Sequence, residues 1–230
     1  MAIETLRGGL TLELPKGCFP LSTDSMALAH FAPAKGRIAD LGAGAGTLGL
    51  LLFGKSRSCT VTGVELSPLA HEAALQNIAR NHLEEHLAAI QGDLRNIREL
   101  LPAGSFDAAV SNPPYFPDGP AGKFPLARRE DGCQLEDVFT AAQWLVRTGG
   151  SFCLVHRPER LTDFVYFGRV HQLEAKRLQL VRHSPQKPVS LVLVEYKKLG
   201  KPGLKWEPEL ILRHADGTPT AAWTEIYQGG

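Results

Sequence analysis

The chain has 230 residues, of which 43% are hydrophobic and 21% are charged, and its formal net charge is +1. These values fit one enzyme domain with a single buried core over residues 1–230. The longest uninterrupted apolar stretch, LGLLLF, is too short to span a bilayer, and MAIETLRGG lacks the basic and apolar regions of a signal peptide. We therefore exclude a membrane protein and expect a cytoplasmic enzyme.

The first thirty residues predict a strand followed by a capped helix. LTLELP alternates apolar and polar side chains, which is typical of a strand or a hairpin arm. Ser22 or Thr23 can cap a helix that runs to about Phe31 and stops at Pro33.

A glycine-rich turn follows the next predicted strand. RIADL predicts a short strand and TLGLLLF the start of a helix, with the turn GAGAG at residues 42–46 between them. Strand, glycine turn and helix N-terminus together form a cradle for a nucleotide-containing cofactor. The next strand, CTVTGVE, ends in Glu65, where a carboxylate can accept hydrogen bonds from both hydroxyls of a ribose.

Two carboxylates bear on the identity of that cofactor. Gly44, Gly46 and Gly49 also fit the spaced-glycine pattern of dinucleotide-binding enzymes, which alone is a weak signal. Asp40 precedes the glycines and would repel a pyrophosphate, and Asp93 follows a third strand. The amino groups of S-adenosylmethionine need such acceptors, so we expect this cofactor rather than a nicotinamide. The alternative is that both aspartates only cap turns or helix starts.

The strongest chemical signal is the run Asn112, Pro113, Pro114 and Tyr115, directly after the apolar strand FDAAVS. The exocyclic amine of a base is a weak nucleophile, because its lone pair is delocalised into the ring. The carboxamide oxygen of Asn112 can accept one N–H and the carbonyl of Pro113 the other, which draws the lone pair out of conjugation. The prolines hold this clamp rigid, and Tyr115 offers a face for stacking an extruded base, worth roughly 1–3 kcal/mol. The alternative is an Asn-Pro turn with the tyrosine as packing.

The connection after this clamp, residues 116–134, is too long and too rich in Gly and Pro to be an ordinary loop. It contains Lys123, Arg128 and Arg129, which can pair with phosphates that flank an extruded nucleotide. We expect it to close over the substrate and to be mobile without RNA. The alternative is an excursion packed by its own phenylalanines.

Basic residues that can bind RNA phosphates are concentrated in the second half of the chain. Residues 1–119 carry nine Lys/Arg against twelve Asp/Glu, whereas residues 120–230 carry sixteen against twelve. The segment 176–205 contains eight basic residues, including Lys197 and Lys198, and a single acid. This asymmetry predicts a phosphate-binding surface. The alternative is a solvated face around strands at the sheet edge.

Strands and helices alternate along the chain, which predicts an α/β fold with a seven-stranded, mostly parallel twisted sheet and helices on both faces. The last two strands are close in sequence and should form an antiparallel pair at one edge. The core spans residues 34–198, and residues 199–230 form an extended tail that folds back on it. Further helices are expected at about 68–82, 135–147 and 158–169, and further strands at about 86–90, 151–155, 175–181 and 189–196.

The cysteines and histidines do not indicate a metal site. Cys18, Cys59, Cys133 and Cys153 have no CxxC pairing and no histidine at ligand spacing, so we expect free thiols and no metal. His156 is the one histidine at a predicted sheet terminus, and we expect a structural rather than a catalytic role for it.

The ordered set DLGAGAG, VTGVE, QGD and SNPPY resembles class I S-adenosylmethionine-dependent methyltransferases that methylate amino groups. The later segments ARRE, LEDV, HRPERL, EAKRL and SLVLVE, with the tail KPGLKWEPELIL, are similar to the bacterial family that methylates adenine N6 beside the anticodon of valine tRNA. The chain departs from this family in its abrupt start and in PLSTDSMAL, which replaces a glycine-bearing stretch.

The resemblance implies a Rossmann-like methyltransferase fold, S-adenosylmethionine as cofactor and tRNA as partner. It assigns the catalytic motif to Asn112 through Tyr115 and makes residues 1–33 a shield over the cofactor. The cofactor residues that it implies come from four segments: Thr23, Asp24, Asp40, Gly42, Gly44, Gly46, Glu65 and Asp93.

Alternatives with the same clamp are a glutamine-N5 protein methyltransferase and an rRNA or DNA amino-methyltransferase, since a side-chain amide and other exocyclic amines present a similar planar nitrogen. From a different class, the chain could be a non-catalytic RNA-binding module that kept the fold.

Overall fold

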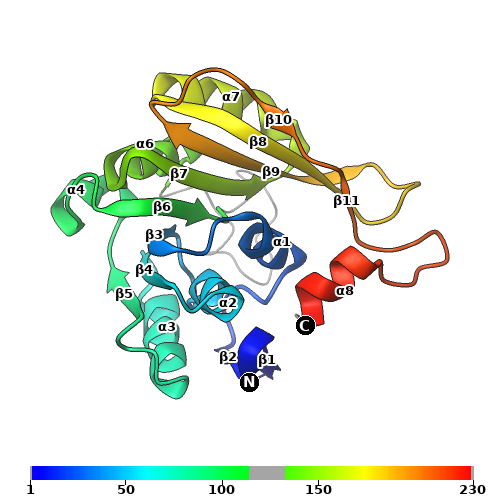
Figure 1. The fold of residues 1–230 in the computed structure, drawn as a ribbon. Coiled ribbons are helices and arrows are strands. Elements are labelled where there is room, and N and C mark those ends of the chain that lie inside the picture. The colour runs from blue at the N-terminus through cyan, green and yellow to red at the C-terminus, as the bar shows by residue number, and fades with distance from the viewer. Residues whose placement is uncertain (1, 114–132, 229–230) are drawn as a thin grey trace.

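A twisted sheet with helices on both faces forms the framework of the computed structural model, which describes residues 2–113 and 133–228 (Figure 1). Nine strands build this sheet in the described residues: β3 (Gly36–Leu41), β4 (Cys59–Glu65), β5 (Leu87–Gln91), β6 (Phe106–Ser111), β7 (Val146–His156), β8 (Leu173–Arg182), β9 (Val189–Lys198), β10 (Lys205–Trp206) and β11 (Leu210–Ile211). Their order is β10-β8-β9-β7-β6-β3-β4-β5, and β11 also pairs with β8. Only β9 runs antiparallel to its neighbours in this part of the chain.

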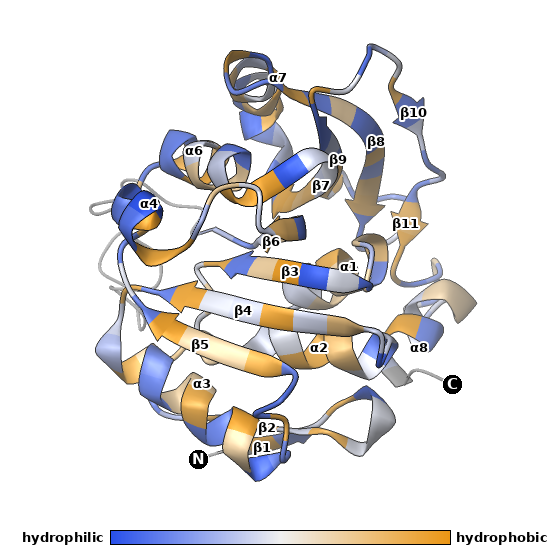
Figure 2. Ribbon diagram, turned by 60° about the vertical axis from the view of Figure 1, so that its left-hand side comes forward, coloured by the Kyte–Doolittle hydropathy of each residue, from blue (hydrophilic) through white to orange (hydrophobic). Residues whose placement is uncertain are grey.

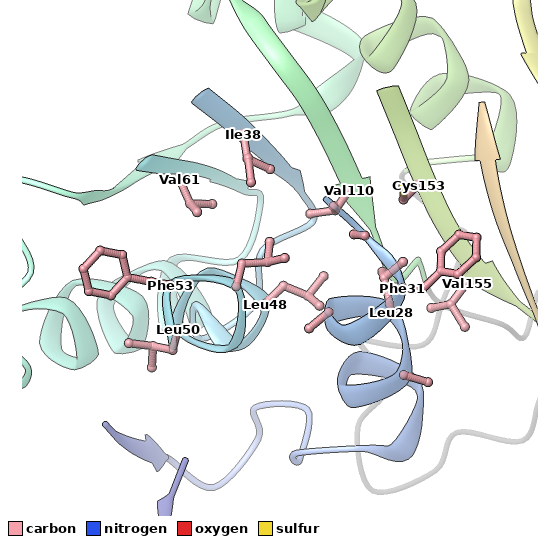
Figure 3. Packing of buried hydrophobic residues seen from close by; sticks show 14 of the residues in the cluster. Leu28, Phe31, Ile38, Leu48, Leu50, Phe53, Val61, Val110, Cys153 and Val155 are labelled. Carbon is pink, nitrogen blue, oxygen red and sulfur yellow. The ribbon is translucent and has the colours of Figure 1, made fainter. Parts of the chain in front are cut away.

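Two hydrophobic clusters hold the helices on the sheet. Because side chains alternate between the faces of a strand, Ile38 packs with the first cluster and its neighbour Ala39 with the second. Figure 3 shows the first cluster, in which Leu28 and Leu48 lie against the sheet. The helices with residues in it are α1 (Thr23–Phe31), α2 (Thr47–Lys55) and α3 (Pro68–Arg80), and those of the second are α4 (Ile97–Leu100), α6 (Leu135–Leu145) and α7 (Leu161–Val170).

Apolar residues dominate β5 and alternate with residues of near-neutral hydropathy along β4 (Figure 2). The N-terminal hairpin of β1 (Ala2–Thr5) and β2 (Thr11–Leu14) is a separate two-stranded sheet. Asn81 of the turn after α3 ties it down, because its Oδ1 accepts from Thr11 N at 2.8 Å and its Nδ2 donates to Thr11 O at 2.7 Å. Short 3-10 turns complete the path: η1 (Arg7–Gly9), η2 (Leu94–Asn96) and η3 (Pro158–Arg160).

The predicted Rossmann-like α/β fold is confirmed, and the last two predicted strands form the expected antiparallel pair as β8 and β9. Two details of the sheet differ. The antiparallel strand β9 lies inside the sheet and not at its edge, because β8 pairs with the side of β9 that faces away from β7. Outside β8 lie the short strands β10 and β11, which the sequence analysis does not predict.

The C-terminal segment folds back over the core but is not simply extended. It ends in helix α8 (Ala221–Gln228), whose Trp223 and Ile226 pack against the first hydrophobic cluster. Leu210 and Leu212 of the preceding segment are buried in the same cluster. The last described segment is therefore a helix that its apolar residues hold against the core, and not an extended tail.

The order of the strands reverses between β3 and β6. From β3 the chain proceeds outward through β4 and β5, and it then returns to the other side of β3 as β6, followed by β7. Ligands of open α/β sheets bind at the carboxyl ends of the strands at such a switch point. The carboxyl edge at β3 and β6 is therefore the expected position of a ligand site.

In the described residues no helix is long and apolar enough to cross a bilayer.

Candidate active site

Four neighbouring strands bring the predicted site residues to one level of the sheet. Asp40 on β3 pairs with Val110 on β6 and with Gly63 on β4. Three predicted site residues lie two positions after these, at the carboxyl edge. They are Gly42 after β3, Asn112 after β6 and Glu65 at the end of β4. Glu65 pairs in turn with Gln91, the last residue of β5 before Gly92 and Asp93. Adjacent strands lie only about 4.8 Å apart, so these segments form one continuous edge.

The glycine loop has a backbone that side chains rarely allow. Gly42, Gly44 and Gly46 have φ angles of 79°, 57° and 81°, which lie in the left-handed region that favours glycine. A Cβ added at Gly42 or Gly44 would meet no atom within 4 Å, so the loop presents bare backbone at both positions. This is the surface that a ligand's phosphate or amino-acid part needs for close approach.

A glycine on β4 allows the loop to lie close to the sheet. A Cβ on Gly63 would stand 2.6 Å from the Cβ of Ala43, which is closer than two such atoms approach. Val64 O accepts hydrogen bonds from Gly42 N at 2.9 Å and Ala43 N at 3.1 Å, which fixes the start of the loop.

The third glycine of the dinucleotide pattern has no comparable role. A Cβ on Gly49 of α2 would lie 3.7 Å from Cγ1 of Val61, an ordinary van der Waals contact. In dinucleotide-binding enzymes the third glycine serves close packing of helix and strand. Because this structure does not require a glycine there, the spacing of Gly44, Gly46 and Gly49 is no argument for a nicotinamide cofactor.

Asp40 is a buried carboxyl group that lacks partners. It is 1% exposed, and neither oxygen has a hydrogen-bond partner in the described residues. It borders a hollow beneath the glycine loop with largely apolar walls, including Val61, Ile78 and Leu87. Burial, with a smaller contribution from Glu65, raises the pKa of Asp40 to about 8. An unpaired buried carboxyl group is costly, and a cationic ligand group would stabilise its ionised form.

The other two predicted carboxylates already bind backbone N–H groups. Glu65 accepts from Gly44 N at 2.8 Å and from Ser67 N at 2.7 Å, so it connects the glycine loop to the turn after β4. Asp93 is the N-cap of η2, and hydrogen bonds from Arg95 lower its pKa. The capping role that was the alternative for Asp93 is thus present. Carboxylate oxygens have further lone pairs, so contacts to a ribose and an adenine amine stay predictions.

Asn112 is held between β6 and helix α1. Ser111, the last residue of β6, donates its hydroxyl to Leu41 O at 2.7 Å and so locks the ends of β6 and β3 together. The Nδ2 of Asn112 donates to Ser25 Oγ on α1 at 3.0 Å. Pro113 is buried. The predicted contributions of Pro114, Tyr115, Lys123, Arg128 and Arg129 lie outside the described residues.

The start of α1 stands at the same edge. Ser22 is its N-cap, as one of the two predicted candidates, and its hydroxyl accepts from Ser25 N at 3.3 Å. Thr23 and Asp24 form the first turn of this helix, and their place in the cofactor pocket stays a prediction. The contact of Ser25 with Asn112 was not predicted, because no sequence pattern links residues 87 positions apart.

A second residue that was not predicted from the sequence binds the backbone of the glycine loop. Asn77 of α3 is 1% exposed and donates through Nδ2 to Ala45 O and to Glu13 O, each at 3.0 Å. A polar side chain among Ala73, Ala74 and Ile78 on the buried face of α3 was the signal available in the sequence.

His156 lies at the end of β7 with 0% exposure, and its Nδ1 accepts from Arg157 N at 2.8 Å. Burial, assisted by the nearby charges of Arg160 and Arg157, lowers the pKa of His156 to about 4. A neutral, packed imidazole agrees with the structural role expected for it. All four cysteines are free thiols, and the described residues contain no cluster of three potential metal ligands.

Lys197 and Lys198 lie away from the carboxyl edge of the sheet. Lys197 pairs with Ser151 in the middle of β7, and Lys198 pairs with Leu173, the first residue of β8, whereas the carboxyl end of β7 pairs with the first half of β9. The ammonium of Lys198 donates to Gln143 O and Val146 O at the end of α6, and that of Lys197 donates to Ser151 Oγ at 2.7 Å. These two residues are therefore remote from Asn112 and engaged within the fold.

Comparisons with known proteins give a family model, relatives of similar sequence and solved structures of the same fold. Residues 23–177 match the family model of the methyltransferase small domain. A tRNA1(Val) (adenine(37)-N6)-methyltransferase of Aliivibrio salmonicida is 29% identical over 203 residues, which cover 86% of this chain and 85% of that protein. The enzyme of the same name from Porphyromonas gingivalis is 29% identical over 69% of this chain but only 64% of its own length. A predicted O-methyltransferase from Agrobacterium tumefaciens shares the fold with a TM-score of 0.74 at 22% identity, covering 89% of this chain and 95% of that one.

Proposed function

The chain belongs to the methyltransferase small domain family, and from this premise we propose that it transfers a methyl group from S-adenosylmethionine to N6 of an adenine in tRNA. As a member of this family, the chain is an S-adenosylmethionine-dependent methyltransferase. One observation carries the finer assignment. Asn112, the first residue of an NPPY motif, stands at the carboxyl edge beside the glycine loop, because β6 and β3 are paired neighbours.

The residues at this edge fit S-adenosylmethionine. The glycine loop presents bare backbone, and Glu65 lies at the adjacent strand end, where a ribose would be held. Neither oxygen of Asp40 has a partner in the described residues, and in its ionised form this carboxyl group provides the negative charge that an α-ammonium group requires, whereas a pyrophosphate would be repelled. When bound, S-adenosylmethionine supplies an electrophilic methyl group.

The chain activates the acceptor by positioning it. The Oδ1 of Asn112 accepts one N–H of the exocyclic amine and the carbonyl of Pro113 accepts the other, so that the nitrogen lone pair points at the methyl carbon. A new N–C bond forms as the S–C bond breaks in line, and the surplus amine proton then leaves to water. Proximity and orientation account for most of the rate enhancement. No strong base is required, which agrees with the buried, neutral His156.

The proposal of tRNA as substrate draws on the relatives, whose names specify adenine 37 of tRNA1(Val). The similar sequence motifs support the same target here, namely the adenosine beside the anticodon of valine tRNA. Such a substrate would place the enzyme in the cytoplasm. Basic residues of segment 116–134, outside the described residues, stay the predicted contacts to its phosphates.

Mass spectrometry of digested nucleosides tests this function. Unmodified valine tRNA, a mixed tRNA pool, rRNA, DNA and a protein fraction are each incubated with the enzyme and isotope-labelled S-adenosylmethionine. We expect the label in N6-methyladenosine from valine tRNA. The Asn112→Ala variant should lose it, whereas Gln76→Ala, which removes an exposed carboxamide on α3, should retain it.

Other outcomes would contradict the proposal in distinct ways. Label in N5-methylglutamine would indicate a protein methyltransferase, and label in rRNA or DNA a different nucleic-acid substrate. Binding of tRNA without binding of S-adenosylmethionine would indicate a non-catalytic RNA-binding module.

A further inference from the structure

We propose that Ser25 is a positioning residue for Asn112: its hydroxyl fixes the orientation of the Asn112 carboxamide so that Oδ1, and not Nδ2, is presented to the substrate amine. This inference rests on the proposed function, in which Asn112 is the acceptor. It starts from the hydrogen bond of 3.0 Å from Asn112 Nδ2 to Ser25 Oγ.

The orientation of this amide decides whether the clamp can work. The oxygen and nitrogen ends of a carboxamide have almost the same shape, and a half-turn about the last side-chain bond exchanges them. In one orientation Oδ1 accepts an N–H of the substrate. In the other, Nδ2 directs its own hydrogens at a group that also donates, and the hydrogen bond is lost. A partner that accepts but does not donate selects the productive orientation.

Ser22 makes Ser25 such a partner. A serine hydroxyl can donate as well as accept, so Ser25 alone would permit both orientations of the amide. The Oγ of Ser22 lies 3.3 Å from Ser25 Oγ and already accepts from Ser25 N at 3.3 Å. If the hydroxyl hydrogen of Ser25 is donated to Ser22, only lone pairs remain to face Asn112. In this arrangement the N-cap of α1 fixes the direction of both hydrogen bonds, from Asn112 to Ser25 and from Ser25 to Ser22.

The helix that carries Ser25 is fixed at both ends. Ser25 itself is 5% exposed, and Leu28, one turn later, is fully buried in the first hydrophobic cluster. Figure 3 shows Leu28 close to Val110 and Val155, which belong to the strands that flank the site. At the far end, Lys55 Nζ donates to Ala32 O at 2.7 Å, and the guanidinium of Arg177 donates to Phe31 O at 2.8 Å. Ser25 is thus held by packing that does not depend on substrate.

A double-mutant cycle tests the proposal. The four proteins are the wild type, Ser25→Ala, Asn112→Ala and the double variant, and the matched control is Ser58→Ala, which removes an exposed hydroxyl at the amino edge of the sheet. For each we measure kcat, KM for tRNA, the Kd of S-adenosylhomocysteine and the urea midpoint. Ser25→Thr keeps the hydroxyl and is the rescue variant.

We expect Ser25→Ala to lower kcat by about tenfold, the size of a lost hydrogen bond, with KM and Kd within about twofold of the wild type. In the Asn112→Ala background the same change should alter kcat by less than about twofold, because no amide is left to orient. Ser25→Thr should recover most of kcat, provided that its urea midpoint matches the wild type.

Three results would overturn the proposal. One is an unchanged kcat in Ser25→Ala, and another is an equal loss of kcat in both backgrounds, which would indicate that Ser25 acts only on the packing of α1. A weaker Kd with unchanged kcat would assign Ser25 to the cofactor pocket instead. Full activity of Asn112→Ala would contradict the proposed function itself, so the two failures are distinguishable.

Discussion

Polar groups at the amino edge of the sheet and the carboxyl group of Asp40 beside the glycine loop differ in whether the fold provides partners for them. At the amino edge the charged side chains satisfy one another. Arg147 pairs with Asp107 at 2.7 Å, and Lys198 donates to two carbonyls at the end of α6. Toward the carboxyl edge Asp40 is buried with neither oxygen partnered in the described residues, and Gly42 and Gly44 leave open backbone.

A buried network between β7, β8 and β9 has complete partners in the same way, although it lies level with Asp40: Glu195 pairs with Cys153, Cys153 with Val110, and Val110 with Asp40. Glu195 is 7% exposed and accepts from Ser151 Oγ at 2.9 Å and from Arg177 Nε at 2.5 Å. Arg177 also lies 4.2 Å over the ring of Phe31, so the network reaches the end of α1. Buried charges that have all their hydrogen-bond partners favour one specific packing arrangement. Polar groups without partners can instead bind a ligand. The difference is that Glu195 has its partners within the fold, whereas Asp40 has none in the described residues and is therefore available to a ligand.

The largest expected effect on kcat comes from a substitution at the carboxyl edge. Asn112→Ala should lower kcat on the order of 10²-fold or more, because the acceptor that acts in the transition state is removed. The affinity for S-adenosylhomocysteine and the urea midpoint should stay close to those of the wild type. Kinetics with tRNA and calorimetry with S-adenosylhomocysteine check both statements, and a variant that turns over normally would refute the role of the carboxyl edge.

The next largest effect is expected on cofactor affinity, from an alanine substitution at Gly63 compared with one at Gly49. Gly63→Ala places two Cβ atoms 2.6 Å apart and must displace the glycine loop. Overpacking of this kind costs about 1–3 kcal/mol, so cofactor affinity should fall on the order of tenfold. The matched control, Gly49→Ala, meets only ordinary contacts and should stabilise α2 by up to about 1 kcal/mol. Equal cofactor affinity in the two variants would contradict this account of the loop.

The pH dependence of stability follows from Asp40. Its pKa in the folded, ligand-free protein is about 8, above the ordinary value of 3.8. Below that ordinary value the carboxyl is protonated in both states. As pH rises from about 4 to about 8, only the unfolded state releases its proton, so the stability declines and then levels off. Asp40→Asn should remove this part of the slope in urea unfolding at a series of pH values, and an unchanged slope would contradict the assignment.

The same residue links cofactor affinity to pH. An α-ammonium group favours the ionised carboxylate, so affinity should rise with pH between about 6 and 7.5, by at most roughly tenfold per unit. Asp40→Asn should give a weaker and nearly flat profile, measured by calorimetry in two buffers of different ionisation enthalpy.

Two lysines provide the smallest effect. Lys187 is exposed on the connection between β8 and β9, at the carboxyl edge, and Lys198 is engaged at the amino edge. Lys187→Ala should raise KM for tRNA a few-fold and reduce the slope of log KM against log salt by about one. Lys198→Ala should leave that slope unchanged and cost about 1–2 kcal/mol of stability, through two lost hydrogen bonds. The reverse pattern would move the RNA surface to the amino edge.

Features determined by local sequence were predictable. The strands that end at Leu41 and Ser111 were found because short apolar runs precede glycine or asparagine turns. The strand β7 begins at Val146, five residues earlier than predicted, because the chain passes directly from α6 into pairing with Phe106. Pairing partners of this kind cannot be read from one segment alone.

Charge counts along the chain were a poor guide to the basic surface. The segment 176–205 appears almost free of acids, but Glu207 and Glu209 follow directly. Arg182 pairs with Glu209 at 2.8 Å and Lys205 with Glu207 at 2.9 Å.

The contact between Ser25 and Asn112 could not be predicted from the sequence either, since it depends on how α1 docks on the sheet.

The central claim is that methyl transfer takes place at the carboxyl edge, where Asn112 meets the glycine loop. A crystal structure with S-adenosylhomocysteine tests it most directly. We predict that the ligand contacts the backbone of residues 42–46, that its ammonium faces Asp40, and that its sulfur lies on the side of Asn112. A ligand bound elsewhere, or an Asn112 side chain directed away from the sulfur, would contradict the account.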